Sequence, residues 1–444
     1  MSANTHFLVF GAGKSATVLI DYLKKLVIER NWSLTVADVD LITIRQKLGV
    51  GENLHAVEIN ITDADKRGQL IQSADIVISL MPPQLHLPIA KDCIHFGKHL
   101  LTASYVDPAI REMANQIKDK KLLFLCEMGL DPGIDHMSAM QLIHNIKAKG
   151  GEIISFYSHC GGLVAPESDD NPWHYKISWN PRNVVLAGKA GALYKMNGKE
   201  IKLDYTEIFH QSGTVNFPEL GTLAYYANRD SLSYTELYAL TSAKDFLRTT
   251  LRYPAFCKGW AALVDLKLTD EDYEYNTSDL TVKDFVEMHI NHHQLTTKWE
   301  SFIADPVLNE QFRFLGLFDT IPIKKELQTP AAILQWRMEK SWVLKADDKD
   351  MIVMMHDIIY SFDKKKYKAV SSLKVIGEDH LRTAMAKTVG MPLAIAAELI
   401  ADGQLKETGL HIPIIPAIYE PVLSRLEKEG VQFYDSLTEI TPSS

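Results

Sequence analysis

A glycine-rich hexapeptide near the N-terminus constrains the fold of this chain more than any other feature. The segment Gly11-Ala12-Gly13-Lys14-Ser15-Ala16 follows an apolar strand pattern at His6–Phe10 and precedes a helical pattern at Ser15–Glu29. A G-x-G-x-x-A motif between a strand and a helix predicts the first turn of a dinucleotide-binding unit. The phosphates of such a ligand lie at the helix N-terminus, where free N–H groups favour negative charge.

The residue types in this loop each have a physical reason. Gly11 permits the tight turn, Gly13 lets the backbone approach a pyrophosphate, and Ala16 keeps helix and strand close. Lys14 can reach a phosphate or point to solvent. We therefore expect six consecutive residues to bind the cofactor: Gly11, Ala12, Gly13, Lys14, Ser15 and Ala16.

The first 126 residues alternate apolar strand patterns with helical patterns, which is typical of a parallel sheet covered on both faces. We expect strands at His6–Phe10, Ser33–Ala37, Leu54–Ile59, Asp75–Leu80, His99–Thr102 and Leu122–Cys126. Helical patterns between them include Ser15–Glu29, His86–Phe96 and Pro108–Lys118. The predicted fold class is therefore α/β, with a Rossmann-type doubly wound parallel sheet.

The pattern changes after Cys126, which indicates a second domain. An amphipathic helix is expected at Met137–Ile146, and mixed strands and loops follow to about Pro254. Residues 270–345 have helical periodicity and few strand signals, and a late helix is expected at Thr383–Ala401. We predict a first domain over 1–130, completed by about 383–444, and an inserted α/β domain over 131–382 with a helical sub-domain at about 270–345.

Asp38 ends the second expected strand, where a carboxylate accepts hydrogen bonds from ribose hydroxyls and repels a 2′-phosphate. No Arg lies immediately beside it, so the sequence favours NAD over NADP. The alternative is that Asp38 caps the following helix, a task that Asp40 can share. Ser79, Leu80 and Met81 end the fourth strand, where they either line the nicotinamide side or form a plain strand exit.

Composition argues against several other classes of protein. The balance of 47 Lys plus Arg against 56 Asp plus Glu gives a net charge of −9, which disfavours nucleic acid or an anionic membrane as partner. No apolar run approaches the roughly 20 residues that span a bilayer. The stretch before the first strand has no basic n-region or cleavage site, so no signal peptide is expected. The four cysteines lack CxxC spacing, so a reducing cytoplasm is expected, without disulfides or a zinc site.

Histidines raise the question of a metal site. His289, His292 and His293 cluster in the helical region, but no carboxylate completes a ligand set at suitable spacing, so no metal is expected. Asp135 and His136 start a helix, where Asp135 is expected to cap and His136 to pack.

Several loop segments are dense in polar, glycine and proline residues. They are Thr102–Tyr105, Glu127–His136, Cys160–Ser168, Asn228–Asp230 and Thr250–Tyr253. With these strings, above all GLDPGIDH and CGGLVAPES, the chain closely resembles the saccharopine reductase family, the glutamate-forming saccharopine dehydrogenases. The resemblance runs from the first glycine loop to the late helix.

This resemblance implies a Rossmann domain, an α/β domain for substrate binding and dimerisation, and a helical lid. It also implies a homodimer and a reaction of lysine metabolism. Hydride would leave saccharopine, a secondary amine with three carboxylates, for the nicotinamide of NAD or NADP. The resulting imine would be hydrolysed to glutamate and aminoadipate semialdehyde.

A substrate with three carboxylates needs fixed cations, and Arg229 and Arg252 can each grip one in a bidentate manner. Arg248, one helical turn before Arg252, is a third candidate. Each Arg can instead be an ordinary surface ion-pair partner. The full set of expected substrate contacts is Ser104, Tyr105, Asp131, Arg229, Thr250, Leu251 and Arg252.

For proton transfer, the resemblance points to Asp131, Cys160 and Tyr105 as catalytic candidates. Asp131 can also be a turn carboxylate, and Cys160 a small buried residue. The amine of the substrate can itself act as the base, leaving no single essential protein group.

Two other functions remain open from the sequence. A related reductase such as carboxynorspermidine synthase would act on a substrate with fewer carboxylates, and the presence of both Arg229 and Arg252 disfavours it. A non-catalytic NAD-binding regulator would keep the glycine loop and lose the polar strings. Asp38 stands where NADP-using relatives tend to carry a basic residue.

Overall fold

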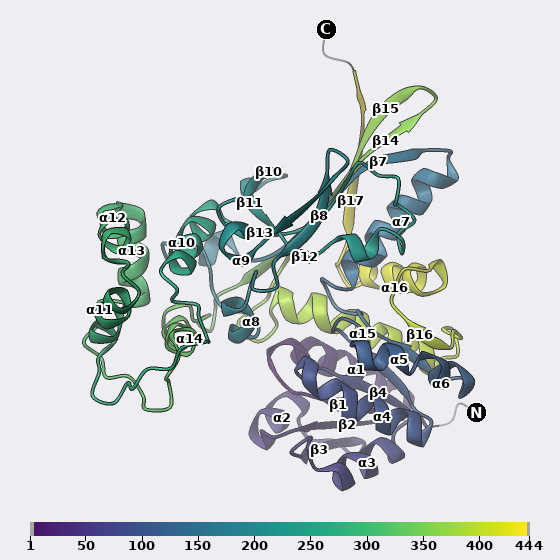
Figure 1. Cartoon of the computed structure of the whole chain (residues 1–444). Coiled ribbons are helices and arrows are strands. Elements are labelled where there is room, and N and C mark those ends of the chain that lie inside the picture. Colours follow the sequence, from purple (N-terminus) through teal and green to yellow (C-terminus); the bar gives the residue numbers. More distant parts are fainter. Residues whose placement is uncertain (1–3, 442–444) are drawn as a thin grey trace. The chain divides into compact units, whose positions relative to one another are not determined.

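A computed structural model describes residues 4–441 of the chain, which form two compact units (Figure 1). The first unit comprises residues 4–151 and 373–434, and the second comprises residues 152–372 and 435–441. The chain leaves the first unit after Gly151 and not after residue 130, because the helix Ile134–Ala148 packs against Pro416–Lys428 of the same unit. It returns at residue 373, ten residues earlier than the sequence predicted.

The first unit contains a seven-stranded parallel sheet in the order β16-β6-β5-β4-β1-β2-β3. Its strands are β1 (His6–Phe10), β2 (Ser33–Asp38), β3 (Leu54–Glu58), β4 (Ile76–Ser79), β5 (His99–Thr102), β6 (Leu123–Leu125) and β16 (Gly409–His411). From β1 the chain moves to β2 and β3 on one side, and then to β4, β5 and β6 on the other. Such a reversal opens a crevice beyond the carboxyl ends of β1 and β4, where open α/β sheets bind ligands.

Helices flank this sheet, which explains why its central strands are mostly apolar. Residues Phe7–Phe10 of β1 are fully buried, as expected for a parallel strand covered on both faces. The helical segments are η1 (Lys14–Ala16), α1 (Thr17–Arg30), α2 (Leu41–Leu48), α3 (Ala64–Ser73), η2 (Pro83–Leu85), α4 (His86–Phe96), α5 (Pro108–Glu112), α6 (Ala114–Asp119), α7 (Ile134–Ala148), α15 (Ala384–Ala401) and α16 (Pro416–Lys428).

The second unit is built on a ten-stranded mixed sheet whose main path is β10-β11-β13-β7-β14-β15-β17. Its strands are β7 (Glu152–Val164), β8 (Ala192–Met196), β9 (Lys199–Leu203), β10 (Gly213–Phe217), β11 (Gly221–Ala227), β12 (Arg229–Asp230), β13 (Asp245–Arg252), β14 (Asp350–Phe362), β15 (Lys365–Ile376) and β17 (Phe433–Ile440). β7 pairs parallel with β13 and antiparallel with β14, and the short strands β8, β9 and β12 attach beside β13.

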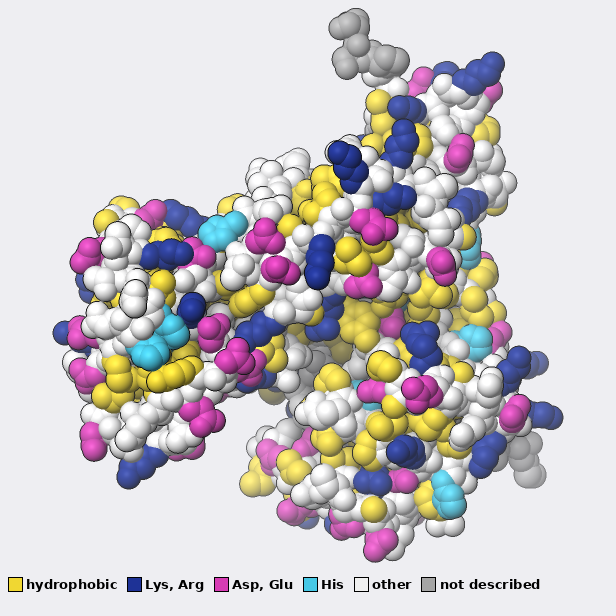
Figure 2. Space-filling view, in the orientation of Figure 1, with side chains coloured by type: hydrophobic (Ala, Val, Ile, Leu, Met, Phe, Trp, Pro, Cys, Tyr) yellow, Lys and Arg dark blue, Asp and Glu magenta, His cyan; other side chains and the backbone are white. Residues whose placement is uncertain are grey.

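A helical part accompanies this sheet, and its surface mixes basic and acidic side chains (Figure 2). Its long helices are α11 (Val282–His292), α12 (Thr296–Ala304), α13 (Pro306–Leu315) and α14 (Pro330–Ser341), preceded by α10 (Pro254–Asp265). The shorter segments of this unit are η3 (Pro166–Ser168), α8 (Pro181–Val185), α9 (Tyr205–Ile208) and η4 (Leu232–Tyr234). Three fully buried indoles, Trp173, Trp260 and Trp342, belong to the core that this part shares with the sheet.

The predicted fold class is confirmed: a doubly wound parallel sheet, a second α/β sheet and a helical sub-domain are all present. The sequence pattern did not reveal the seventh strand, β16, because it is three residues long and pairs with β6, a strand far away in sequence.

α15 is the one helix in the described part of the chain that is long and apolar enough to cross a membrane by length and composition. However, 78% of it is buried inside the protein, which is the property of a core helix. It packs against α1 and α16, and small residues make this close approach possible.

Gly390 marks the closest approach of α15 to α1. A methyl group added there would lie 3.0 Å from the Leu19 Cβ and 3.1 Å from the Ser15 carbonyl oxygen. We predict that Gly390→Ala lowers the free energy of unfolding by about 1–3 kcal/mol, because backbone must move to admit the methyl group. Thermal or urea denaturation measures this difference.

Gly68→Ala in α3 is the matched control. A methyl group at Gly68 would meet only the Phe96 ring, at an ordinary 3.5 Å. Alanine has the higher helix propensity, so this variant should be neutral or more stable by up to about 1 kcal/mol. Equal destabilisation of both variants would contradict our account of the contact between α1 and α15.

Candidate functional site

The glycine loop that joins β1 to η1 and α1 has the geometry of a phosphate cradle. Gly11 has a φ of +101°, and a side chain there would meet the Leu80 carbonyl oxygen at 3.0 Å. A methyl group added at Gly13 would have no heavy atom within 4 Å. The loop is therefore held tightly at Gly11 and leaves open space at Gly13, where a pyrophosphate can approach. The residues present fit a dinucleotide.

Asp38 at the end of β2 lies against this loop. Its Oδ2 accepts a 2.6 Å hydrogen bond from the Ala12 N–H, and its Oδ1 accepts a 3.2 Å bond from the Asp40 N–H. Asp40, not Asp38, is the N-cap of α2 and accepts the N–H groups of Ile42 and Thr43. The alternative that Asp38 serves as a helix cap is therefore wrong.

Lys47 is a cation at the glycine loop that the sequence analysis missed. Its Nζ donates a 2.6 Å hydrogen bond to the Gly13 carbonyl oxygen. Burial lowers the pKa of Lys47, and the negative charge of Asp38 opposes that shift. No local pattern indicates this contact, because α2 must fold back before a residue nine positions after Asp38 can reach the loop. Lys14, by contrast, is exposed in η1.

The ends of β4 and β5 meet at a buried histidine, which the sequence analysis also missed. Ser79 is fully buried, and its Oγ lies 2.9 Å from the Nδ1 of His86, the first residue of α4. The His86 Nε2 lies 2.8 Å from the Ser104 Oγ and 3.3 Å from the Thr102 Oγ1. A predicted cofactor residue and a predicted substrate residue are thus joined through one imidazole. Leu80 and Met81 follow Ser79, and the Leu80 N–H donates to the Phe10 carbonyl of β1.

Glu127, just after β6, fastens the loops that carry Ser104, Tyr105 and Asp131. Its N–H donates to the Ser104 carbonyl at 3.0 Å, and its Oε1 accepts the Val106 N–H at 3.2 Å. The first unit therefore brings these two predicted substrate loops together at the carboxyl edge of the parallel sheet.

His136 in turn fixes Glu127. Its Nε2 lies 2.8 Å from the Glu127 Oε2, and both side chains are buried. The neighbouring Asp135 lies in the first turn of α7 and accepts the Gly133 N–H at 2.6 Å. Gly133 is the N-cap of this helix, so Asp135 supports the turn before it and does not occupy the cap position.

In the second unit, a row of side chains crosses one face of the sheet. Thr250 of β13 is in register with Cys160 of β7 and with Tyr226 of β11, and Cys160 is in register with Met354 of β14. Residues in register in neighbouring strands point to the same face. Cys160, one of the catalytic candidates, is 5% exposed.

Arg248 and Arg252 share this face because β13 is a strand. The sequence pattern predicts a loop at Thr250–Arg252 and one helical turn between Arg248 and Arg252, and both predictions are wrong. Side chains of a strand alternate, so Arg248, Thr250 and Arg252 point one way and Leu251 points the other. Leu251 is fully buried in a separate apolar cluster, so only its backbone is available to a ligand on the arginine face.

Arg252 is a buried cation with an incomplete set of partners. It is 4% exposed, and its guanidinium lies over the rings of Tyr175 and Phe256 at 5.2 and 5.3 Å. Its Nη1 donates to the carbonyls of Leu251 and Gly162, whereas its Nε has no hydrogen-bond partner among the described residues. Within residues 4–441 no carboxylate forms an ion pair with Arg252. A buried charge without a counter-charge is costly, so this site has the chemistry to receive an anion.

Arg229 lies apart from this row. It is exposed on β12, has a φ of +53°, and its strand pairs with Ala192 and Leu193 of β8. The Asn228 N–H donates to the Arg248 carbonyl, and the Arg248 N–H donates to the Ser231 Oγ, so the turn around Arg229 is fastened to β13 at Arg248.

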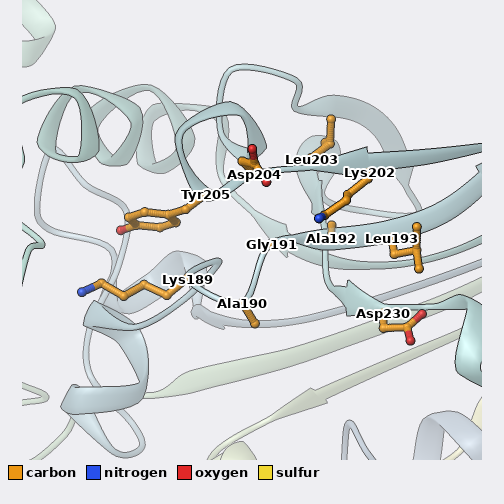
Figure 3. A pocket seen from close by; sticks show the side chains of 10 residues that line it. All are labelled: Lys189, Ala190, Gly191, Ala192, Leu193, Lys202, Leu203, Asp204, Tyr205 and Asp230. Carbon is orange, nitrogen blue, oxygen red and sulfur yellow. The ribbon is translucent and has the colours of Figure 1, made fainter.

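A cavity of about 270 Å³ opens at the ends of β8 and β9 (Figure 3). Lys202 extends from β9 and Asp230 from β12, and Lys189 and Tyr205 lie at the other side. Two of its charged residues have structural roles: Asp230 accepts the N–H groups of Leu232 and Ser233, and Lys189 pairs with Glu271. None of the predicted substrate residues lines this cavity.

Two histidines of the helical part, His289 and His293, lie near the hydroxyl group of Tyr275. The His289 Nδ1 lies 2.9 Å from the Tyr275 hydroxyl, and its Nε2 lies 2.9 Å from the Leu266 carbonyl. In the described part of the chain, no group of three or more His, Cys, Asp or Glu residues is placed to hold a metal ion.

Two family models match this chain. Residues 7–125 match the saccharopine dehydrogenase NADP binding domain, and residues 129–431 match the saccharopine dehydrogenase C-terminal domain. The chain belongs to the saccharopine dehydrogenase family. The first of these matches includes the glycine loop described above, and the second includes Cys160, Thr250 and Arg252, which share one face of the ten-stranded sheet.

Curated relatives are similar along almost the whole chain. Mouse mitochondrial alpha-aminoadipic semialdehyde synthase is 33% identical over 449 residues, which is 98% of this chain and 48% of the relative. The chain thus spans about half the length of that relative. The saccharopine dehydrogenase [NADP(+), L-glutamate-forming] of Saccharomyces cerevisiae is 32% identical over 444 residues, with 96% of this chain and 97% of the relative covered.

A solved structure is similar to the whole fold. The apo saccharopine dehydrogenase (L-Glu forming) from Saccharomyces cerevisiae aligns with a TM-score of 0.88 and 29% identity, covering 98% of this chain and 100% of the other. The saccharopine dehydrogenase family resemblance inferred from the GLDPGIDH and CGGLVAPES strings is therefore confirmed.

The contrast between Gly11 and Gly13 generates a prediction for the cofactor cradle. Gly13→Val should reduce the affinity for the dinucleotide at least about tenfold, because the valine fills the space of the pyrophosphate. Its melting temperature without ligand should change little, since a Cβ at Gly13 has no heavy atom within 4 Å. Calorimetric titration with NADPH and thermal melting measure the two quantities.

Gly11→Ala is the comparison variant. The φ of Gly11 is positive, and a methyl group there would meet the Leu80 carbonyl oxygen. We therefore expect this variant to melt at a lower temperature even without ligand. Undiminished dinucleotide binding by Gly13→Val would show that the phosphates lie elsewhere.

Proposed function

We propose that this chain is an oxidoreductase of lysine metabolism that interconverts saccharopine with glutamate and aminoadipate semialdehyde. The observation that carries the proposal is the buried Arg252, whose site is suited to an anion and lies on the same sheet face as Thr250 and Cys160. The names of the yeast relative and of the similar solved structure support it. A related condensing reductase and a non-catalytic regulator are not favoured, because the relatives over the whole chain are named for this chemistry.

Saccharopine carries three carboxylates, and the chain offers cations and hydroxyls to bind them. Arg252 would bind one carboxylate with its guanidinium, whose Nε has no hydrogen-bond partner among the described residues. Arg248 on the same face and Arg229 on β12 are the further cations. Ser104, Tyr105 and Thr250 would add hydroxyl contacts.

The cofactor would be held by residues Gly11–Ala16 at the phosphates and by Asp38 at the ribose. When bound, the dinucleotide supplies the nicotinamide that accepts or gives a hydride. We propose NADP as this cofactor. The family model and the yeast relative carry NADP in their names, and Lys47 supplies a positive charge at the loop. The NAD preference inferred from Asp38 is not supported, because that inference considered only residues adjacent in sequence.

Proton transfer would be divided between the substrate and the protein. The amine must be neutral before a hydride can leave its carbon, and water must later attack the imine. Asp131 in the loop fastened by Glu127, Tyr105 and Cys160 are the candidates for these steps. The substrate amine can also act as its own base, as noted from the sequence.

The expected homodimer and cytoplasmic location stay predictions. The terminal strand β17 lies at the edge of the ten-stranded sheet and exposes Tyr434, Leu437 and Ile440. This edge is the surface that we would assign to a second copy of the chain.

Absorbance of the reduced nicotinamide measures the reaction directly. We expect purified protein to reduce NADP in the presence of saccharopine and to turn over NADP faster than NAD. A preference for NAD would overturn the role given to Lys47 and restore that of Asp38, while leaving the reaction intact. Cofactor binding without turnover of saccharopine would overturn the proposed function.

Arg252→Gln tests the carboxylate site. We expect the KM for saccharopine to rise roughly 10–100-fold, because a hydrogen bond to a charged group contributes about 1.5–3 kcal/mol. Stability should change by less than about 1 kcal/mol, since the variant also removes an uncompensated buried charge.

Arg337→Gln is the structural control for that variant. Arg337 is 7% exposed, donates to the Leu315 carbonyl and pairs with Asp319 at 2.7 Å. Its replacement should lower the free energy of unfolding by about 1–3 kcal/mol and leave the KM unchanged. An Arg252→Gln enzyme that behaves like the Arg337 variant would mean that Arg252 has only a structural role.

A further inference from the structure

His86 occupies an unusual position in the first unit, between the ends of two neighbouring strands. Ser79 of β4 is in register with Thr102 of β5, so their side chains lie next to each other at the carboxyl edge of the sheet. The His86 ring bridges them and reaches Ser104 beyond, with distances of 2.9 Å to Ser79, 3.3 Å to Thr102 and 2.8 Å to Ser104. His86 is 3% exposed, and Ser79 and Thr102 are more deeply buried still.

Burial lowers the pKa of His86 to about 4, so the ring is neutral at physiological pH. A neutral imidazole has one N–H donor and one acceptor nitrogen. The Thr102 Oγ1 already accepts the Ser104 N–H at 3.2 Å, which holds the Ser104 backbone in place. The direction of the remaining hydroxyl protons therefore depends on which ring nitrogen carries the hydrogen.

One tautomer suits a negatively charged ligand. If Nε2 carries the hydrogen, it donates to the Ser104 Oγ, and Nδ1 accepts the Ser79 hydroxyl proton. The Ser104 hydroxyl then has its own proton left for an acceptor outside this cluster. In the other tautomer, Ser104 donates its proton back to the ring and offers only lone pairs, which would repel a carboxylate.

We infer that His86 is a positioning residue that turns the Ser104 hydroxyl toward a carboxylate of the substrate. This inference rests on the proposed function, because it takes saccharopine as the anionic ligand. His86 does not touch the substrate. It acts through Ser104, and its second bond, to Ser79, ties that hydroxyl to the strand end predicted to line the nicotinamide side.

A double-mutant cycle separates this role from a merely structural one. His86→Ala and Ser104→Ala should each raise the KM for saccharopine roughly tenfold, the effect of one hydrogen bond to a charged group. The double variant should also be impaired roughly tenfold rather than a hundredfold, because both changes remove the same bond. The affinity for NADPH, measured by titration, should stay unchanged in all three variants.

Two amide variants distinguish loss of the hydrogen bond to Ser104 from loss of folding. Glutamine places its amide nitrogen near the position of Nε2 and can donate to Ser104, whereas asparagine reaches only the position of Nδ1 and Ser79. We expect His86→Gln to recover most of the wild-type KM and His86→Asn to resemble His86→Ala, with thermal melting as the measure of folding for both.

The outcomes separate a failure of the role given to His86 from a failure of the proposed function. Suppose that the wild-type chain turns over saccharopine and that the double alanine variant raises the KM for saccharopine roughly a hundredfold. This result would overturn the role of His86 and leave the proposed function intact. Equal recovery by glutamine and asparagine would do the same. Absence of turnover in the wild-type chain would overturn the proposed function and this inference together.

Discussion

The parallel pairing of strands in the first unit determines where its chemistry can occur. Because β1, β2, β4, β5 and β6 run in the same direction, all their carboxyl ends lie at one edge of the sheet. The glycine loop, Asp38, Ser79, Ser104 and Asp131 each follow one of these ends. Residues separated by more than a hundred positions in sequence thereby share one edge, and the hydrogen bonds of His86 and Glu127 set the spacing among their loops.

In the second unit the governing constraint is alternation along a strand. β13 presents Arg248, Thr250 and Arg252 to one face and buries Leu251 on the other. The protein places a guanidinium among aromatic rings without a carboxylate beside it. This arrangement sacrifices stability in the free protein and keeps a cation desolvated in advance, so an arriving carboxylate meets a strong field.

The sequence predicted the elements of the first unit well, because their apolar runs and caps are local signals. The bounds of β1, β5 and α4 agree with the expected His6–Phe10, His99–Thr102 and His86–Phe96. Thr250–Arg252 was misplaced in a loop because two buried arginines hide the apolar alternation of a strand. Lys47 and His86 had no local signal at all, since each gains its role from a contact that forms only when distant segments meet. The same limit explains why Asp38 alone pointed to NAD.

The late return of the chain has a consequence for biosynthesis. Residues 373–434 provide α15, β16 and α16 to the first unit, and β17 completes the edge of the ten-stranded sheet. While a nascent chain still lacks this last segment, α1 has no partner in α15 and β6 has an open edge. Both sheets then expose surface that residues 373–440 later cover, so we expect the chain to be more prone to aggregation until these residues have been made.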